Sequence, residues 1–210
     1  MGTVTGRCVI WGAAPVGPSM LELLRPGDHI IAADGGWVTA RSLGVQPHCI
    51  LGDFDSAPRP DDPDAIVLPT VKDDTDTQYA TRLALEDGYT DILYLGVLGG
   101  KRLDHTLAAL QTALGAARQG AKVMLADENT EIHILLEGQS IRLEPRADWY
   151  FSLLAMGGEV TGVSEKGSFY ELENGSLQPD FPLGVSNEFA GKPVEVSIGT
   201  GSALLVLARK

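Results

Sequence analysis

The residues best suited to chemistry are aspartates in two short motifs, GDFDS over residues 52–56 and KDDTD over residues 72–76. The carboxylates in them are Asp53, Asp55, Asp73, Asp74 and Asp76. Like charges held close together raise each other's pKa, so a cation usually balances carboxylates gathered in this way. Carboxylate oxygens suit hard cations such as Mg²⁺. The motifs therefore predict a metal site, provided that the fold brings them together.

A third motif, GGKRLDH over residues 99–105, carries the opposite charge and opens a predicted helix. Its glycines allow backbone N–H groups to approach a phosphate, and the helix N-terminus adds partial positive charge. Lys101 and Arg102 can neutralise phosphate oxygens, Arg102 with a bidentate contact. The chain lacks the Gly-x-x-x-x-Gly-Lys-Ser/Thr pattern of a P-loop. The motifs together predict that a nucleotide is held through a cation.

The elements that must position these motifs alternate along the first part of the chain. Strands are expected at residues 8–12, 30–33, 48–51, 65–68, 92–97 and 122–126, and helices at 19–24, 37–43, 75–87 and from 103 to about 120. The last helix shows leucines at helical spacing, Leu103, Leu107, Leu110 and Leu114, which predicts one apolar face. This alternation is typical of a doubly wound, mainly parallel, Rossmann-like sheet.

After residue 127 the pattern changes to short strands without a helical period. They are expected at residues 130–136, 140–143, 149–154, 159–163, 167–172, 192–198 and 202–207. Turn signals separate them, among them Asn174-Gly175. We therefore expect an α/β catalytic, nucleotide-binding domain over residues 1–127 and an antiparallel β domain over residues 128–210.

The predicted sheet would gather the scattered motifs at one place, because ligands of open parallel sheets bind at the carboxyl ends of the strands. The sequence DGG at residues 34–36 follows the second strand, and Asp53 and Asp55 follow the third. The KDDTD motif follows the fourth strand and the GGKRLDH motif follows the fifth. An aspartate at the end of a strand often serves only to cap the following helix. Asp74 or Thr75 is available as the cap of the helix expected at residues 75–87.

The overall charge excludes some classes of partner. The 210 residues carry a formal net charge of −12 without a cluster of Lys or Arg, which argues against nucleic-acid or anionic-membrane surfaces. No apolar run approaches the roughly 18 residues of a membrane span, and the N-terminus does not resemble a signal peptide. Cys8 and Cys49 sit in apolar runs and are expected to be buried thiols. We expect a cytoplasmic protein.

Taken together, the four motifs at residues 34–36, 52–56, 72–76 and 99–105 resemble those of the thiamine pyrophosphokinase (thiamine diphosphokinase) family, and SNE at 186–188 matches more loosely. The resemblance implies an α/β domain, a C-terminal β-sandwich that binds thiamine and dimerises, and a homodimer with active sites at the subunit interface. It also implies Mg²⁺-dependent transfer of pyrophosphate from ATP to the hydroxyl of thiamine, giving thiamine diphosphate and AMP.

The resemblance also implies residue roles. Around the metal it places Asp53, Asp55 and Asp76, and catalysis would use these three with Asp73. The nucleotide side would comprise Asp34, Gly35, Gly99, Gly100, Lys101, Arg102, Asp104 and His105. The substrate side would comprise Asp74, Thr75, Gln78, Ser186 and Asn187. Some relatives pack a tryptophan of the last strand on thiamine, where this chain has ALLV over residues 203–206.

Two other functions stay open on the sequence. The stretch LGDFDS at residues 51–56 faintly resembles the Asp-x-Asp motif of haloacid-dehalogenase-type phosphatases, which use an aspartate nucleophile. Its place on the third strand, and the other acids that it leaves unexplained, count against this interpretation. A non-catalytic sensor of nucleotide or thiamine is the second alternative, and it would bind tightly without turnover.

Overall fold

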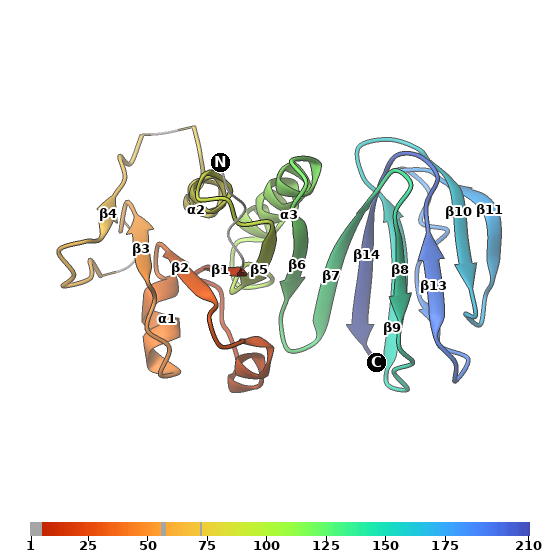
Figure 1. Cartoon of the computed structure of the whole chain (residues 1–210), viewed down its shortest axis with the longest axis horizontal. Helices are drawn as coiled ribbons and strands as arrows, with labels where there is room; N and C mark the ends of the chain where they lie inside the picture. The colour runs from red at the N-terminus through yellow and green to blue at the C-terminus, as the bar shows by residue number, and fades with distance from the viewer. Residues whose placement is uncertain (1–5, 56–57, 72) are drawn as a thin grey trace. The chain divides into compact units, whose positions relative to one another are not determined.

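The computed structural model describes residues 6–55, 58–71 and 73–210. Ser56 and Lys72, which belong to the two aspartate motifs, lie outside the described residues. The chain folds into two compact units, residues 1–128 and residues 129–210 (Figure 1). Catalytic, thiamine-binding and dimerisation roles for these units remain predictions.

The first unit is built on a parallel sheet with strand order β6-β5-β1-β2-β3-β4. Its strands are β1 (Cys8–Trp11), β2 (His29–Ala33), β3 (Cys49–Gly52), β4 (Ile66–Val67), β5 (Asp91–Leu95) and β6 (Lys122–Ala126). Its helices are the 3-10 helix η1 (Pro18–Leu23), α1 (Gly36–Ser42), α2 (Asp76–Glu86) and α3 (Leu103–Arg118). Strand β1 lies between β2 and β5, so the order of strands reverses there, at the position where such sheets bind ligands.

Helices cover both faces of this sheet, which makes the unit doubly wound (Figure 1). On one face Val9, Trp11 and Leu93 pack with Ala40 of α1 and with side chains of η1. On the other face the hydroxyl of Tyr94 lies 3.2 Å from Thr81 Oγ1 of α2. Strands buried on both faces contain unbroken apolar runs, which is why the sequence shows them so clearly.

The second unit contains two antiparallel sheets, with orders β12-β9-β14-β7 and β11-β10-β13-β8. The strands are β7 (Thr130–Leu136), β8 (Ser140–Leu143), β9 (Trp149–Ala155), β10 (Val160–Lys166), β11 (Leu172–Leu177), β12 (Asn187–Glu188), β13 (Val194–Ser197) and β14 (Ser202–Arg209). One apolar core joins residues of both sheets, such as Phe151 and Leu205 with Val163 and Val196. The predicted fold class, an α/β sheet followed by an antiparallel β-sandwich, is confirmed.

Two predictions about local structure in this unit are wrong. The strand expected at residues 167–172 is found instead at Leu172–Leu177, and it runs through Asn174-Gly175, which we expected to be a turn. Asn174 adopts φ 49°, and the pairing of β10 with β11 shifts register at Val163↔Gly175. The left-handed conformation that asparagine tolerates therefore serves a β-bulge here, and the chain does not reverse.

The predicted apolar face of α3 is wrong over its first two turns. Leu103 is 71% exposed and Leu107 is 54% exposed. The buried side is formed mainly by small residues, Ala109, Thr112, Ala113, Leu114, Ala116 and Ala117. Small side chains allow α3 to pack closely on its neighbours, α2 and β6.

Among the described residues, no helix is long and apolar enough to cross a membrane.

Candidate functional site

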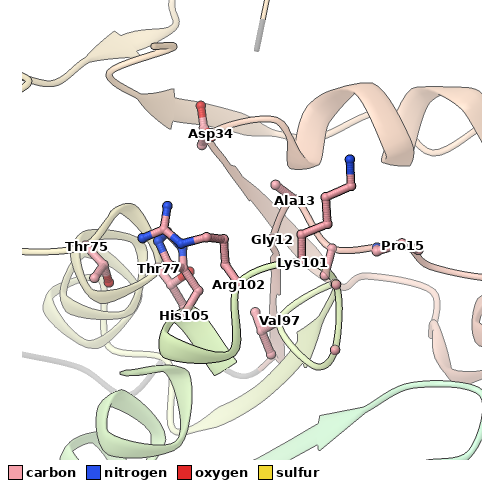
Figure 2. A pocket seen from close by; sticks show the side chains of 14 residues that line it. Gly12, Ala13, Pro15, Asp34, Thr75, Thr77, Val97, Lys101, Arg102 and His105 are labelled. Carbon is pink, nitrogen blue, oxygen red and sulfur yellow. The ribbon is translucent and has the colours of Figure 1, made fainter. Parts of the chain in front are cut away.

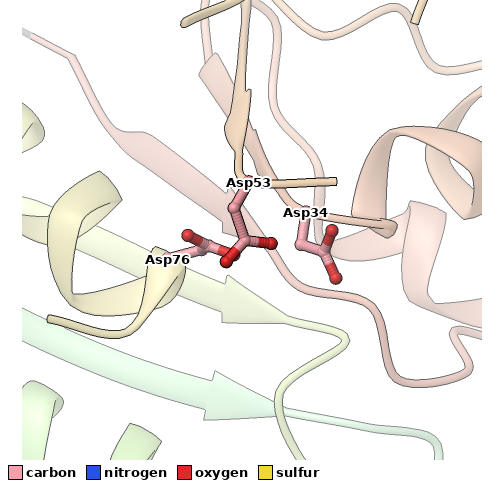
Figure 3. A group of neighbouring side chains, drawn as sticks. All are labelled: Asp34, Asp53 and Asp76. Atoms are coloured by element: carbon pink, nitrogen blue, oxygen red, sulfur yellow. The ribbon is translucent and has the colours of Figure 1, made fainter. Parts of the chain in front are cut away.

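Three aspartates from different elements meet at the carboxyl edge of the sheet (Figure 3). Asp34 directly follows β2, Asp53 directly follows β3, and Asp76 is the first residue of α2. One carboxylate oxygen from each lies within 4.8 Å of the others, and all three residues are half-buried. This group is a candidate divalent-cation site, because three close carboxylates repel one another unless a cation compensates them.

Local backbone structure fixes each member of the group. The Asp34 N–H donates to Leu51 O at 2.8 Å, which ties the end of β2 to β3. Asp34 adopts φ 47°, a left-handed conformation that aspartate tolerates better than most residues. A Cβ on Gly52 would lie 2.9 Å from Asp34 Cα, so only glycine permits this approach. Thr75 caps α2 by accepting the Gln78 N–H at 3.1 Å, which places Asp76 in the first turn.

The predicted metal residues and the observed group differ by one member. Among the described residues the group contains Asp34, which we assigned to the nucleotide side, together with Asp53 and Asp76. Asp55 is exposed and donates its backbone N–H to Asp53 Oδ1 at 3.2 Å. The pKa of Arg102 is raised mainly by its hydrogen bond to Asp104, and the charge of Asp55 adds to this effect. A role for Asp55 at the metal stays a prediction.

Beside the carboxylates lies a cavity of about 460 Å³ (Figure 2). It is lined by Gly12, Ala13, Ala14, Pro15, Asp34, Thr75, Thr77, Gly96, Val97, Gly99, Gly100, Lys101, Arg102 and His105. Gly99 and Gly100 have φ of 69° and 76°, conformations that L side chains rarely adopt. The glycine-rich loop predicted to hold phosphates therefore forms one wall of this cavity.

Residues 12–15 after β1 also line the cavity, and none of the sequence motifs marks them. They adjoin the glycine-rich loop, since a Cβ on Gly100 would lie 3.5 Å from Ala14 Cβ. Gly12 N–H donates to Leu95 O and Ala14 N–H donates to Gly96 O, both at 2.8 Å. A Cβ on Gly12 would lie 2.4 Å from Gly96 O. The available signal was the small-residue run GAA directly after the first strand, and the strand order gives it meaning because β1 is where the order reverses.

Two positively charged side chains, Lys101 and Arg102, line the cavity from the loop before α3. Figure 2 shows Lys101 on the side of Ala13 and Pro15, and Arg102 on the side of Thr75, Thr77 and His105. These two positive groups and the neighbouring carboxylates give the cavity both charges that an Mg²⁺–phosphate ligand needs. A helix N-terminus, that of α3, follows directly.

The guanidinium of Arg102 is hydrogen-bonded to the carboxylate of Asp104. Arg102 Nε donates to Asp104 Oδ1 at 2.9 Å, and Arg102 Nη2 donates to Oδ2 at 2.6 Å. These bonds lower the pKa of Asp104 to about 2 and raise the pKa of Arg102. Both side chains are exposed, so an incoming phosphate competes with Asp104 for the same donors.

Four predicted site residues line a second cavity of about 320 Å³ near the start of α2. They are Asp73, Asp74, Thr75 and Gln78, and Thr75 also lines the larger cavity. Asp74 Oδ2 accepts a hydrogen bond from Arg82 at 2.5 Å. Gln78 Oε1 accepts one from Thr112 Oγ1 at 3.0 Å, which ties α2 to α3. These residues therefore lie beside the Asp34–Asp53–Asp76 group and do not belong to it.

The predicted substrate residues Ser186 and Asn187 lie in the second unit. Ser186 adopts φ 63°, and its N–H donates to Ser152 Oγ at 2.9 Å. Asn187 begins β12, and its side chain is buried. Both residues are held by contacts within that unit.

An open parallel sheet with carboxylates and a glycine-rich basic loop at its carboxyl edge defines the class of α/β proteins that bind phosphate-bearing ligands. Two family models match the chain in succession: the thiamin pyrophosphokinase catalytic domain over residues 20–125 and the thiamin pyrophosphokinase vitamin B1 binding domain over residues 138–204. The chain belongs to the thiamin pyrophosphokinase family, and the resemblance inferred from its four motifs is confirmed.

Individual relatives agree with the family models. Thiamine pyrophosphokinase of Bacillus subtilis (strain 168) is 26% identical over 183 residues, which are 84% of this chain and 85% of the relative. The crystal structure of the Bacillus subtilis enzyme superposes with a TM-score of 0.87 at 23% identity, covering 98% of this chain and 100% of the other. The Candida albicans enzyme gives a TM-score of 0.79 at 16% identity, covering 98% and 89%. These structures share the fold of both units.

Proposed function

We propose that this chain is an Mg²⁺-dependent thiamine diphosphokinase, which transfers a diphosphate group from ATP to the hydroxyl of thiamine. The observation that carries the proposal is the Asp34–Asp53–Asp76 group at the same sheet edge as the glycine-rich basic loop. Family membership supports thiamine as the acceptor and ATP as the donor. The products are thiamine diphosphate and AMP.

The donor set of the three aspartates fits Mg²⁺, which is typically held by one or two carboxylates together with water and substrate phosphates. Asp34, Asp53 and Asp76 would hold the ion. When bound, the ion neutralises phosphate charge and orients the phosphate chain. Lys101 and Arg102 line the cavity and would bind phosphate oxygens, and the absence of side chains at Gly99 and Gly100 would let the loop backbone approach them.

In the reaction the hydroxyl oxygen of thiamine forms a bond to the β-phosphorus of ATP. The bond from that phosphorus to the oxygen shared with the α-phosphate breaks, so AMP leaves with the bonding electron pair. The hydroxyl proton passes to a carboxylate within hydrogen-bond reach, and the catalytic candidates are Asp53, Asp55, Asp73 and Asp76. Most of the rate enhancement comes from positioning and charge neutralisation, as in other phosphoryl transfers.

The charge of the chain suits the acceptor, because thiamine is a cation and the chain carries a net charge of −12. Asp74 and Gln78 are engaged with Arg82 and Thr112, whereas Thr75 lines both cavities beside the carboxylates. We assign Asp74, Thr75 and Gln78 of the first unit to the substrate side of the site. Ser186 and Asn187, which lie in the second unit, are assigned separately to thiamine binding.

A homodimer and a cytoplasmic location belong to the same proposal. Large apolar side chains are exposed in the isolated chain, including Phe169 at 65% and Phe181 at 62%, which supports a partner surface. Light scattering of the purified protein should give twice the 22.3 kDa chain mass. Cell fractionation should place the protein with cytoplasmic markers.

One assay tests the reaction. The purified chain is incubated with ATP, MgCl₂ and thiamine, and AMP, thiamine diphosphate and inorganic phosphate are quantified. AMP and thiamine diphosphate should form in equal amounts and only when thiamine is present. Inorganic phosphate release without thiamine would support the phosphohydrolase instead, and tight binding without turnover would support the sensor.

Asp53→Ala or Asp76→Ala should abolish turnover in a folded protein, because each removes a carboxylate from the candidate cation site. Circular dichroism and the melting temperature check that the variants fold. Asp61→Asn is the matched control, since Asp61 is exposed in the loop before β4 and lies outside the three-aspartate group. Near-normal activity of either alanine variant would contradict the assigned site.

A further inference from the structure

The second unit contains a cavity of its own, of about 230 Å³. Its lining residues are Glu165, Tyr170, Glu171, Leu172, Leu183, Gly184, Val185 and Asn187. Ligand pockets for whole small molecules usually measure at least about 300 Å³. The smaller volume and the apolar leucine and valine walls fit a single aromatic ring better than a nucleotide.

The side chain of Asn187 has no hydrogen-bonding capacity left for a ligand. Its Nδ2 donates to Glu165 Oε2 at 2.5 Å and to Tyr170 O at 2.8 Å. Its Oδ1 accepts from Tyr170 N–H at 3.0 Å and from Glu188 N–H at 2.8 Å. A primary amide has two N–H donors and two acceptor lone pairs, so all four are used. Asn187 can therefore hold the cavity wall in place but cannot bind a ligand without breaking one of these bonds.

Glu165, unlike Asn187, has a hydrogen-bond acceptor that is available to a ligand. It lies on β10, pairs with buried Val196 of β13, and is only 3% exposed. Asn187 occupies its Oε2, whereas Oε1 is buried and has no hydrogen-bond partner among the described residues. Burial raises the pKa of Glu165, against the lowering effect of the Asn187 hydrogen bond. Nearly all buried polar atoms are hydrogen-bonded, so an unused carboxyl oxygen on a residue that lines a cavity calls for a ligand.

Another part of the cavity lining, residues 184–185, is held in place by β9. The Leu153 N–H of β9 donates to Gly184 O at 2.8 Å, and a Cβ on Gly184 would lie 2.3 Å from Leu153 O. Ser186 N–H is bound to Ser152 Oγ two residues further on. Residues 184–186 are thus fastened to β9 through their backbone. A ring entering the cavity would not have to order this segment.

We propose that Glu165 is a specificity-determining residue whose free carboxyl oxygen accepts a hydrogen bond from the N–H group of an aromatic amine in this cavity, while Asn187 positions it. The inference rests on the proposed function, under which the amine is the exocyclic amino group on the pyrimidine ring of thiamine. The family resemblance would assign the polar contact with thiamine to Asn187. The proposal assigns this contact to Glu165, which lies in none of the sequence motifs.

Glu165→Gln tests the proposal with almost no change in size. The Asn187 N–H must still find an acceptor, so the glutamine oxygen is held toward Asn187 and its NH₂ group replaces the free oxygen. A donor then meets the donor of the ligand. Glu195→Gln is the matched control, because Glu195 carries the same charge change on neighbouring β13 but is exposed.

In the thiamine assay, Glu165→Gln should raise KM for thiamine roughly tenfold to a hundredfold, the range for a lost hydrogen bond to a charged or buried partner. KM for ATP should stay within about twofold, a split that a general loss of structure would not produce. Glu195→Gln should change neither constant. An unchanged KM for thiamine in Glu165→Gln, or equal losses for both substrates, would overturn the proposal.

Binding of the ring alone gives a test that needs no turnover. The unmodified protein is titrated by NMR with 4-amino-2-methylpyrimidine and with 2-methylpyrimidine, which lacks the amine. We expect the amine to bind about tenfold more tightly to the wild type. Glu165→Gln should remove this preference. Equal binding of the two rings to the wild type would overturn the proposal even if the variant failed to fold.

These experiments distinguish a failure of the proposed function from a failure of the role proposed for Glu165. If the wild-type protein forms no thiamine diphosphate, the proposed function is refuted. The titration with the two pyrimidines then still tests whether the cavity beside Glu165 binds an aromatic amine. A wild-type protein that forms thiamine diphosphate, with the same KM for thiamine in Glu165→Gln, refutes the role of Glu165 and leaves the proposed function standing.

Discussion

Replacing Asp34 by asparagine should affect the protein in two opposite directions. In the absence of ligand the substitution removes one of three carboxylates that lie within 4.8 Å of each other, so the folded protein should become more stable. In the presence of Mg²⁺ and ATP the same substitution removes a ligand charge, so the stabilisation by Mg-ATP should shrink. A residue with a purely structural role would not produce this reversal.

The distances set the size of the effect. Two unit charges 4.8 Å apart repel by about 1 kcal/mol at the permittivity of water and by about 3.5 kcal/mol at an effective value of about 20. Asp34 interacts with both Asp53 and Asp76, and all three are half-buried, so a net gain of about 1–3 kcal/mol is expected for the ligand-free state. For a chain of this size that corresponds to a rise of about 2–12 °C in Tm.

Thermal unfolding with and without Mg-ATP measures both effects. Mg-ATP at about a hundred times its Kd should stabilise the wild type by about 2.7 kcal/mol, and Asp34→Asn by clearly less. Asp61→Asn is the control for loss of one negative charge elsewhere in the same unit. A ligand-free Asp34→Asn variant that melted below the wild type and kept the full Mg-ATP shift would refute the assignment of Asp34 to a cation site.

Two further predictions concern ion pairs. Asp104→Asn should leave the melting temperature almost unchanged, because its pair with Arg102 is exposed, and should lower KM for ATP about two- to fivefold by releasing the guanidinium; a higher KM would mean that Asp104 itself contacts the nucleotide. Burial raises the pKa of Glu131, but hydrogen bonds from His133 and Arg146 outweigh it and bring the pKa to about 2, below its ordinary 4.5. The stabilisation from this carboxylate is present above pH 4.5 and is lost as the pH falls toward 2. Urea unfolding across that range should show a smaller pH dependence in Glu131→Gln, and identical slopes would contradict the assignment.

The sheet of the first unit could be predicted from sequence because its strands are buried on both faces. Runs such as Cys8–Trp11 then contain apolar residues only, and polar residues begin where a strand reaches the ligand edge. The same logic placed Asp53 and Asp76 near one another. The prediction followed from topology, which is a property of whole elements and needs no side-chain detail.

The order of strands and helices could not show which aspartates form the Asp34–Asp53–Asp76 group. Asp53 and Asp55 are equivalent in the motif, yet only Asp53 joins Asp34 and Asp76 within the described residues. Which of two aspartates turns inward depends on local φ and ψ, and Phe54 between them adopts φ 55°. A residue pattern carries no signal for that choice.

The bulge at Asn174 and the exposed leucines of α3 escaped prediction for related reasons. An asparagine with positive φ serves a hairpin turn and a β-bulge equally well, and only the partner strand decides between them. Leucines at helical spacing indicate a helix face that will be covered, but they do not tell whether the same chain covers it. Leu103 and Leu107 remain exposed in the isolated chain.

The contact between Gly12 and Gly96 has a consequence for the energetics of nucleotide binding. Hydrogen bonds join the loop after β1 to the end of β5, and neither glycine has room for a side chain. Ordering a backbone residue costs about 1–2 kcal/mol of conformational entropy, and this cost falls on folding of the domain, before any ligand arrives. The two walls of the cavity should therefore behave as one rigid body, and binding should cost little loop entropy. Adaptation to different nucleotides is then left to the side chains of Lys101 and Arg102, while the backbone cradle stays fixed.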